Sequence, residues 1–234
     1  MNSIFSAIQV RRRSHGFTLV EMLVVIAIMS ILMTAGAIGL GGMGGKGVTS
    51  GVASAESLFD EARSIAVGQR TKARLLVFKK PTSGTDYTNS LRKIAIVSEA
   101  LKADGTVDTN NWVLSSRGTT LPDQTFFSQT YSKKGKDDPK SPNGDLDVMT
   151  LPATAKSFEG DYWYYEFNPE GICATPGASF VIGTGAKSLS ADAKPKVTSS
   201  AKRDFGGFVV WRNGRTSVFR SADQMKIPSD VKDF

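Results

Sequence analysis

An uncharged segment near the start of the chain, residues 22–40, limits what the N-terminal part can fold into. Its length is close to the roughly 20 apolar residues that a helix needs to cross a bilayer. Arg11, Arg12 and Arg13 precede it, and the first 16 residues contain no acid. Basic residues before a span favour a cytoplasmic location for that end. The sequence therefore predicts a membrane helix, with the rest of the chain outside the cytoplasm.

Glu21 borders this apolar segment, four positions after Phe17. A carboxylate at the centre of a membrane costs roughly 2.5 kcal/mol or more, and such residues are usually functional and have a partner. If the chain were cut between Gly16 and Phe17, the new amino group would lie about one helical turn from the Glu21 carboxylate. The alternative is a carboxylate at the rim of the span that turns toward water.

The residues from Arg11 to Glu21 resemble the class III leader of type IV pilins and type II secretion pseudopilins. In that family a prepilin peptidase cuts after a glycine and N-methylates the new first residue. The resemblance implies that Gly16 ends the leader and that Phe17 is the methylated mature N-terminus. It also implies that Glu21 neutralises the N-terminal amine of a neighbouring subunit during assembly.

A cleavable secretory signal is the alternative for the N-terminus, with Ala35, Gly36 and Ala37 as the cleavage site. The apolar segment is longer than the core of a usual signal, however. A secretory signal also leaves the similarity between residues 11–21 and the prepilin leader unexplained.

Composition restricts the chemistry of the chain, which has 234 residues and a formal net charge of +7. Three of these charges belong to the leader, and the remaining excess is spread over many positions. Cys173 is the only cysteine and His15, in the leader, is the only histidine. These residues exclude an internal disulfide, and they offer no zinc site and no Cys–His nucleophile. We therefore expect a structural thiol, no cofactor and no enzymatic activity, although acid–base chemistry on Asp, Glu or Lys stays open.

Four segments are predicted from these features: a cleaved leader (1–16), a transmembrane and assembly helix (17–40), a glycine-rich flexible segment (41–51) and a periplasmic globular domain (52–234). Each glycine costs a helix roughly 1 kcal/mol relative to alanine. The glycines of residues 41–51 therefore favour a kinked or melted segment rather than a continuous helix.

The globular part reads as a helix followed by antiparallel strands, which is an α+β, pilin-like fold. Apolar residues recur at helical spacing from about Val52 to the stop at Gly68, on the face formed by Ala55, Leu58, Phe59, Ala62, Ile65 and Ala66. About seven strands are expected, the clearest at residues 71–78, 91–97, 112–114, 162–167, 179–182, 208–211 and 216–219. Asn213 and Gly214 favour a type I′ turn between the last two.

Residues 115–160 are predicted to be irregular. They include possible oxygen ligands for calcium, namely Asp137, Asp138, Asn143, Asp145 and Asp147. They also include the basic residues Lys133, Lys134, Lys136 and Lys140, which suit a nucleic-acid patch. A solvated, mobile loop is the simpler interpretation, since the spacing of an EF-hand is absent.

Several short segments of the globular part resemble the GspH/FimT group of minor pseudopilins and minor pilins. They are residues 62–66, the basic strand 71–77, the turn 167–171, the strand 180–182 and the hairpin around Gly214 and Arg215. Relative to a minimal domain of this group, residues 115–160 and 183–201 are insertions. A major pseudopilin is the alternative within the family.

The resemblance implies a structural subunit of a type II secretion pseudopilus, anchored in the bacterial inner membrane by residues 17–40. Its partners would be other pilin-like subunits, the prepilin peptidase and an inner-membrane assembly platform. A minor type IV pilin, with a role in pilus assembly or DNA uptake, is one alternative. A membrane-anchored periplasmic enzyme is another.

Overall fold

The structure is a computed structural model that describes residues 19–41, 43–136, 138, 141–190, 193–198 and 203–234, without the side chains of residues 31–46 and 153. The chain divides into two compact units, residues 1–42 and 43–234. Within the first unit, helix α1 (Leu19–Gly41) covers most of the predicted membrane segment.

Helix α2 (Met43–Gln69) opens the second unit and differs in its start from the sequence-based expectation. Helical structure was expected from about Val52, but it begins at Met43 and includes most of the glycine-rich segment. The compact unit also begins at Met43 rather than at residue 52. The helix is packed here, since Val48 and Val52 are buried.

Close packing at Gly51 helps to explain why helix forms despite the glycines. A Cβ built on Gly51 would lie 2.8 Å from Cδ1 of Ile182, closer than real Cβ atoms approach a neighbour. The bare backbone therefore lets α2 come near the strand that carries Ile182. Burial gained in this way offsets the low helix propensity of glycine.

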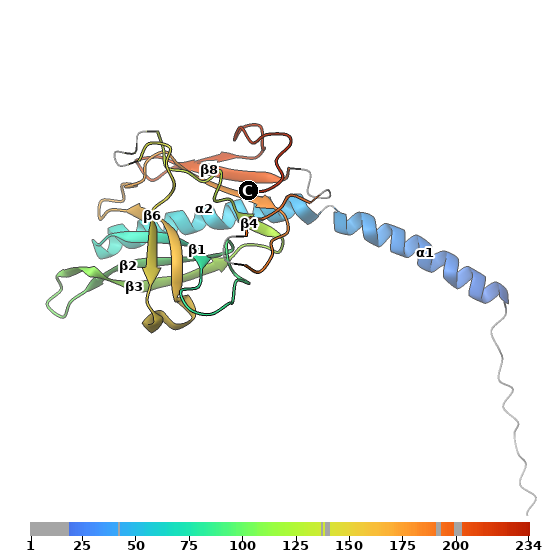
Figure 1. The fold of residues 1–234 in the computed structure, drawn as a ribbon, viewed down its shortest axis with the longest axis horizontal. Coiled ribbons are helices and arrows are strands. Elements are labelled where there is room, and N and C mark those ends of the chain that lie inside the picture. Colours follow the sequence, from blue (N-terminus) through green and yellow to red (C-terminus); the bar gives the residue numbers. More distant parts are fainter. Residues whose placement is uncertain (1–18, 42, 137, 139–140, 191–192, 199–202) are drawn as a thin grey trace, which may run out of the picture. The chain divides into compact units, whose positions relative to one another are not determined.

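In the described residues after α2, nine strands form two antiparallel sheets. Sheet A has the strand order β3-β2-β1-β6-β5, and sheet B has the order β4-β7-β8-β9 (Figure 1). The strands and the one 3₁₀ helix are β1 (Ala73–Lys80), β2 (Lys93–Leu101), β3 (Val107–Thr120), β4 (Thr125–Phe127), β5 (Val148–Leu151), η1 (Ala153–Phe158), β6 (Gly160–Phe167), β7 (Ala178–Thr184), β8 (Phe205–Val210) and β9 (Thr216–Phe219).

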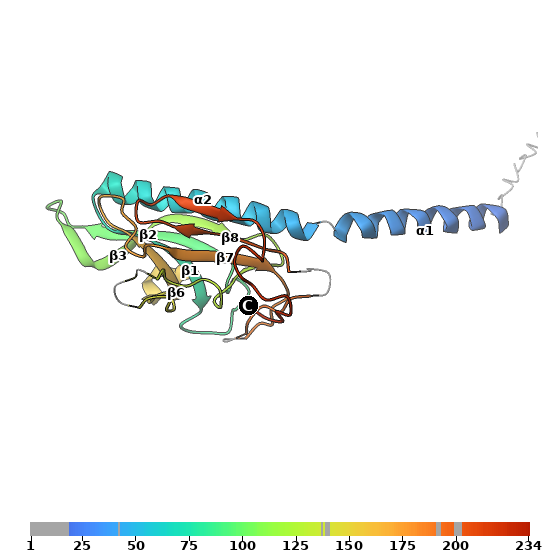
Figure 2. The same ribbon diagram turned by 90° about the horizontal axis from the view of Figure 1, so that it is seen from above.

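The main core lies where α2 packs on both sheets (Figure 2). Phe59 of α2 is 1% exposed, and its ring centroid lies 4.9–6.2 Å from those of Tyr165, Phe167, Phe180 and Phe208. These four rings come from β6, β7 and β8, so one side chain of the helix joins the two sheets. The predicted apolar face of α2 is confirmed, because five of its members are buried and Ile65 packs against them.

The strand predictions are right in kind but incomplete. Residues 115–160 are not irregular throughout, since they contain the last six residues of β3, together with β4, β5 and η1. The short strand expected at residues 112–114 is the middle of β3, which has 14 residues.

The predicted type I′ turn between β8 and β9 is wrong. Gly214 has a φ of +76°, but Asn213 has no positive φ, which a type I′ turn requires at both central residues. The N–H of Gly214 donates to the carbonyl of Trp211, and the N–H of Trp211 donates to the carbonyl of Arg215, each at 2.8 Å. This is a three-residue hairpin loop with glycine in the left-handed conformation.

Candidate functional site

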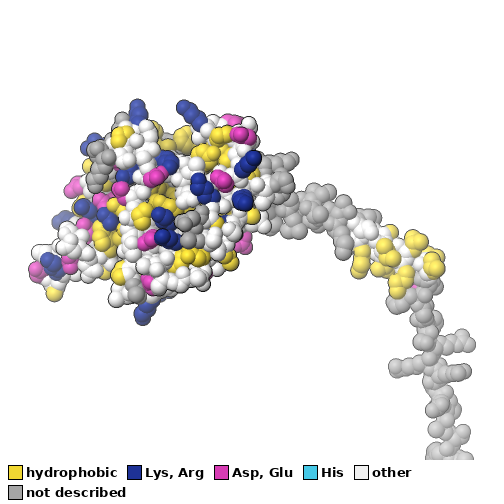
Figure 3. Space-filling view, in the orientation of Figure 1, with side chains coloured by type: hydrophobic (Ala, Val, Ile, Leu, Met, Phe, Trp, Pro, Cys, Tyr) yellow, Lys and Arg dark blue, Asp and Glu magenta, His cyan; other side chains and the backbone are white. Residues whose placement is uncertain are grey.

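Helix α1 exposes apolar side chains on all of its sides. Residues 19–30 are all exposed, and Leu19 reaches 81%. Figure 3 shows these hydrophobic side chains along the part of α1 that carries described side chains. A helix that is apolar all round is stable only when something covers it, either lipid or other protein. Within its own unit, no described residue buries the side chains of residues 19–30.

Glu21 lies in the first turn of α1. The N-terminal end of a helix carries a partial positive charge, which favours a carboxylate in the first turn. Gly16 and Phe17, the predicted cleavage and methylation site, lie outside the described residues. Over the residues with described side chains, no helix has the combined length and apolar character of a membrane span.

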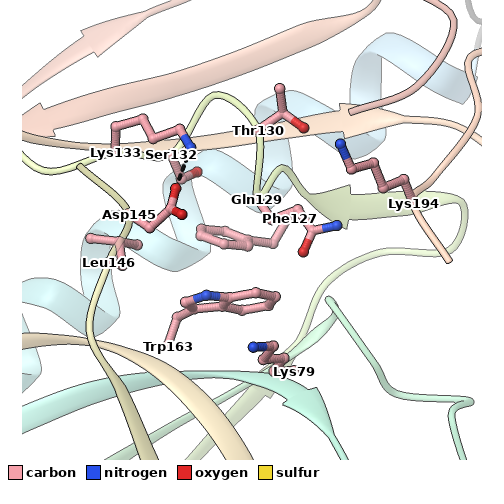
Figure 4. Close-up of a pocket in the computed structure, with 10 residues that line it drawn as sticks. All are labelled: Lys79, Phe127, Gln129, Thr130, Ser132, Lys133, Asp145, Leu146, Trp163 and Lys194. Atoms are coloured by element: carbon pink, nitrogen blue, oxygen red, sulfur yellow. Dashed lines mark hydrogen bonds and ion pairs between the residues drawn. The ribbon is translucent and has the colours of Figure 1, made fainter. Parts of the chain in front are cut away.

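A cavity of about 330 Å³ opens in the globular unit between strands of both sheets. In Figure 4, Phe127 and Trp163 lie together at its centre, with lysine side chains at three points around them. Lys79 comes from β1, Lys133 from the loop after β4, and Lys194 from the segment between β7 and β8. Sequence reasoning missed this cavity, because its residues are far apart in the chain and no local motif marks them.

Asp145 is the one carboxylate that lines this cavity among the described residues, and it forms an ion pair with Lys133. The hydrogen bond from Lys133 holds the pKa of Asp145 below its ordinary value. The positive charges of Lys133 and Lys79 act in the same direction. The cavity is therefore electropositive, with three lysines against one acid.

This ion pair and a second one, between Lys134 and Asp147, change the predictions made for residues 133–147. Lys134 is buried and its Nζ lies 2.8 Å from Oδ1 of Asp147, so this segment is not the solvated loop that we expected. Of the proposed calcium ligands, Asp145 and Asp147 each face a different lysine, and Asp137 lies outside the described residues. Of the lysines proposed as a nucleic-acid patch, Lys133 and Lys134 are in ion pairs.

Cys173 is buried, as predicted for a structural thiol. Desolvation raises the pKa of its thiol, which further lowers its reactivity. In the described part of the chain, no group of three or more His, Cys, Asp or Glu side chains could hold a metal ion.

Three of the short segments that resemble the GspH/FimT group meet at one end of the globular unit. Nε of Arg63, in α2, donates to the carbonyl oxygen of Gly171 at 3.1 Å. A Cβ on Gly214 would lie 2.7 Å from Cδ of Arg63. The turn at Gly171 and the hairpin at Gly214 thus both pack against one arginine of α2, although they are far apart in the sequence.

Comparison with known proteins begins at the N-terminus. Residues 11–37 match the prokaryotic N-terminal methylation motif, and this range contains Gly16, Phe17 and Glu21. No curated protein matches the chain.

Among solved structures, the minor type IV pilin FimU of Pseudomonas aeruginosa is similar, with 14% sequence identity, coverage of 75% of this chain and 90% of that chain, and a TM-score of 0.37. The minor pseudopilin EpsH from the type II secretion system of Vibrio cholerae has 12% identity, covers 75% of this chain and 95% of that chain, and gives a TM-score of 0.36.

The methylation motif stands at the head of an α+β chain in which a helix packs along antiparallel sheets. The motif identifies residues 11–37 as an N-terminal methylation segment, and the globular unit that follows it has an α+β fold.

Proposed function

We propose that this protein is a structural subunit, a minor pseudopilin, of a type II secretion pseudopilus. After cleavage between Gly16 and Phe17 and methylation of Phe17, the apolar helix of residues 17–40 anchors the subunit in the inner membrane. During assembly the same helix leaves the lipid and packs with the helices of other pilin-like subunits. The globular unit stays in the periplasm, outside the helical bundle.

The single observation that supports this proposal most is the exposure of the apolar side chains of residues 19–30 of α1, within a methylation motif. Exposed apolar area of this kind drives association because its burial is favourable by about 25 cal/mol per Å². Glu21 adds specificity: its carboxylate is proposed to meet the methylated amine of Phe17 from a neighbouring subunit. Either charge left without its partner inside the helical bundle would cost several kcal/mol. Arrangements that pair the Glu21 carboxylate with the Phe17 amine of a neighbour are therefore favoured.

The test replaces Glu21 with alanine in the native host. We expect Glu21→Ala to abolish incorporation into filaments, measured by cross-linking of subunits and by secretion of the exported proteins. Its globular unit should unfold at the same temperature as that of the unaltered protein. Normal incorporation of this variant would contradict the proposal.

Mass spectrometry of the membrane-extracted protein provides the matching test for the leader. The mature chain should begin at Phe17 and carry one extra methyl group. A chain that begins at Met1, or beyond Leu32, would contradict the proposed processing.

A minor type IV pilin is the second candidate. The electropositive cavity and the basic net charge are compatible with a role in DNA uptake, because DNA is an anion. In the face shown in Figure 3, basic side chains are scattered among acidic ones rather than gathered in one patch. A DNA-binding subunit should retard a DNA duplex in an electrophoretic mobility-shift assay at low salt. Its affinity for the duplex should fall steeply as the salt concentration rises. Deletion of the gene separates the two machines: loss of protein secretion supports the pseudopilin, and loss of pili supports the pilin.

A further inference from the structure

We propose that the cavity around Phe127 and Trp163 is a binding site for a small ligand that carries two or more carboxylate groups. This ligand is either a free di- or tricarboxylic acid or an acidic peptide segment of another subunit. The site is separate from the assembly helix, and nothing in the proposed filament function requires it. Its residues are drawn in Figure 4.

The origin of the lining residues is the first argument. Only Lys79 and Trp163 belong to the strands β1 and β6 of the sheet A core. All the others belong to residues 127–146 or to Lys194, which fall in the two segments that the sequence analysis expects to be insertions relative to a minimal domain. Two segments that are distant in sequence therefore converge on one cavity.

The backbone at Lys79 is the second argument. Phe78 pairs with Tyr162 and Lys80 pairs with Asp161, so Lys79 is an extra residue, a β-bulge, between two consecutive partners on β6. Bulges occur often beside functional sites, because they change the direction in which a side chain points. Here the bulged residue is one of the three lysines, and its Nζ lies 5.2 Å from the centroid of the Trp163 ring.

Charge is the third argument. Asp145 pairs with Lys133, but within the described part of the chain no carboxylate lies in ion-pair distance of Lys79 or Lys194. Two ammonium groups are therefore available for an anion at the edge of an apolar surface. A ligand with two or more carboxylates complements this excess of about two charges.

The hydroxyl of Thr130 is the fourth argument. Its oxygen atom is buried and makes no hydrogen bond with any described residue. A buried polar group without a partner costs about 1–3 kcal/mol, so such groups in native proteins usually have a reason. Because this oxygen atom has almost no accessible surface, the side chain of Thr130, which lines the cavity, must rotate before its O–H can donate to a carboxylate oxygen of the ligand. The cavity volume of about 330 Å³ suits a small molecule or one or two acidic side chains.

Calorimetric titration of the full-length chain in non-ionic detergent tests the site. Citrate and a tetraglutamate peptide are the two probes, because they represent the free acid and the acidic segment. We expect saturable binding of at least one of them at low salt, weaker as salt screens the lysines. The probe that binds more tightly identifies the source of the carboxylates.

Variants assign the binding to this cavity. Lys79→Gln and Lys194→Gln should each weaken binding about tenfold, the effect of losing one charged hydrogen bond. Thr130→Val should also weaken it without lowering the unfolding temperature, since the valine removes only the unpartnered hydroxyl. The matched control is Lys136→Gln, an exposed lysine that does not line the cavity, and it should bind as the unaltered chain does.

Two results would overturn the proposal. One is the absence of saturable binding for both probes at millimolar concentration. The other is binding that the double variant Lys79→Gln/Lys194→Gln retains while its unfolding temperature is unchanged.

Discussion

Helices α1 and α2 follow one another in the chain but use their apolar side chains in opposite ways. In α1 the described side chains are exposed on every side, including those of Leu19 and Leu23. In α2 one face is buried against two sheets, with Phe59 at its centre, while Asp60 and Glu61 face solvent. The comparison teaches that the hydrophobicity of α2 stabilises the globular fold, whereas the described apolar side chains of α1 contribute nothing to the core of that fold.

The largest expected effect tests this division directly. Phe59→Ala should lower the free energy of unfolding of the globular unit by about 3–5 kcal/mol, because it leaves a cavity among four aromatic rings. Leu23→Ala, the matched change in α1, should leave that free energy unchanged. Chemical denaturation of the full-length chain in non-ionic detergent measures both. Equal losses for the two variants would break the comparison.

A smaller effect is expected at the glycines of α2. Gly51→Val should destabilise the globular unit by about 1–3 kcal/mol, since the new side chain meets Ile182. Gly68→Ala should instead stabilise it by about 1 kcal/mol, because no atom lies within 4 Å of the added Cβ and alanine is the better helix former. Thermal unfolding of the two variants should shift in opposite directions. If Gly51→Val also stabilises the protein, the close approach of the α2 backbone to Ile182 does not require glycine at position 51.

The smallest effect concerns Asp204, which borders the groove beside Val48 and Val52 of α2. Burial raises the pKa of this carboxyl above its ordinary value of 3.8, although the hydroxyl of Thr184 donates to it. Because the folded state favours the protonated form, stability falls as pH rises through the raised pKa. Asp204→Asn removes this titration and can still accept the hydroxyl of Thr184.

The variant should therefore be slightly more stable than the unaltered protein at neutral pH. The difference should vanish below pH 3.8, where the aspartic acid is protonated in both states. Unfolding temperatures measured across this range check the sign. A difference that grows on acidification would contradict the assignment.

Local patterns predicted the parts of the fold that local chemistry controls. The helical spacing of Ala55, Phe59 and Ala62 identified the buried face of α2, and aromatic residues identified β6. The resemblance of residues 11–21 to a prepilin leader agrees with the methylation motif matched over residues 11–37, because such a motif is a local pattern of sequence. The glycine-rich start of α2 was misjudged, since helix propensity is only one contribution and packing against Ile182 outweighs it.

Features that depend on distant residues escaped prediction. The division into two sheets and the length of β3 follow from pairing between strands, which a single sequence does not display. The cavity escaped for the same reason, because Lys79 and Lys194 have no relation in sequence. The prediction for the hairpin between β8 and β9 was partly right. Gly214 takes the left-handed conformation as expected, but the loop has three residues, one more than a type I′ turn.

Strand β3 has a further consequence as the outer strand of sheet A. An edge strand invites a second copy to add its own strand, the route by which many proteins aggregate. Here β3 carries Asp108, Asn110 and Asn111, and its pairing with β2 is interrupted at three places. These polar side chains and the irregular register work against pairing with a second copy, even though Val113 and Leu114 of the same strand are exposed. The edge of sheet A is thereby protected from strand addition without a covering segment.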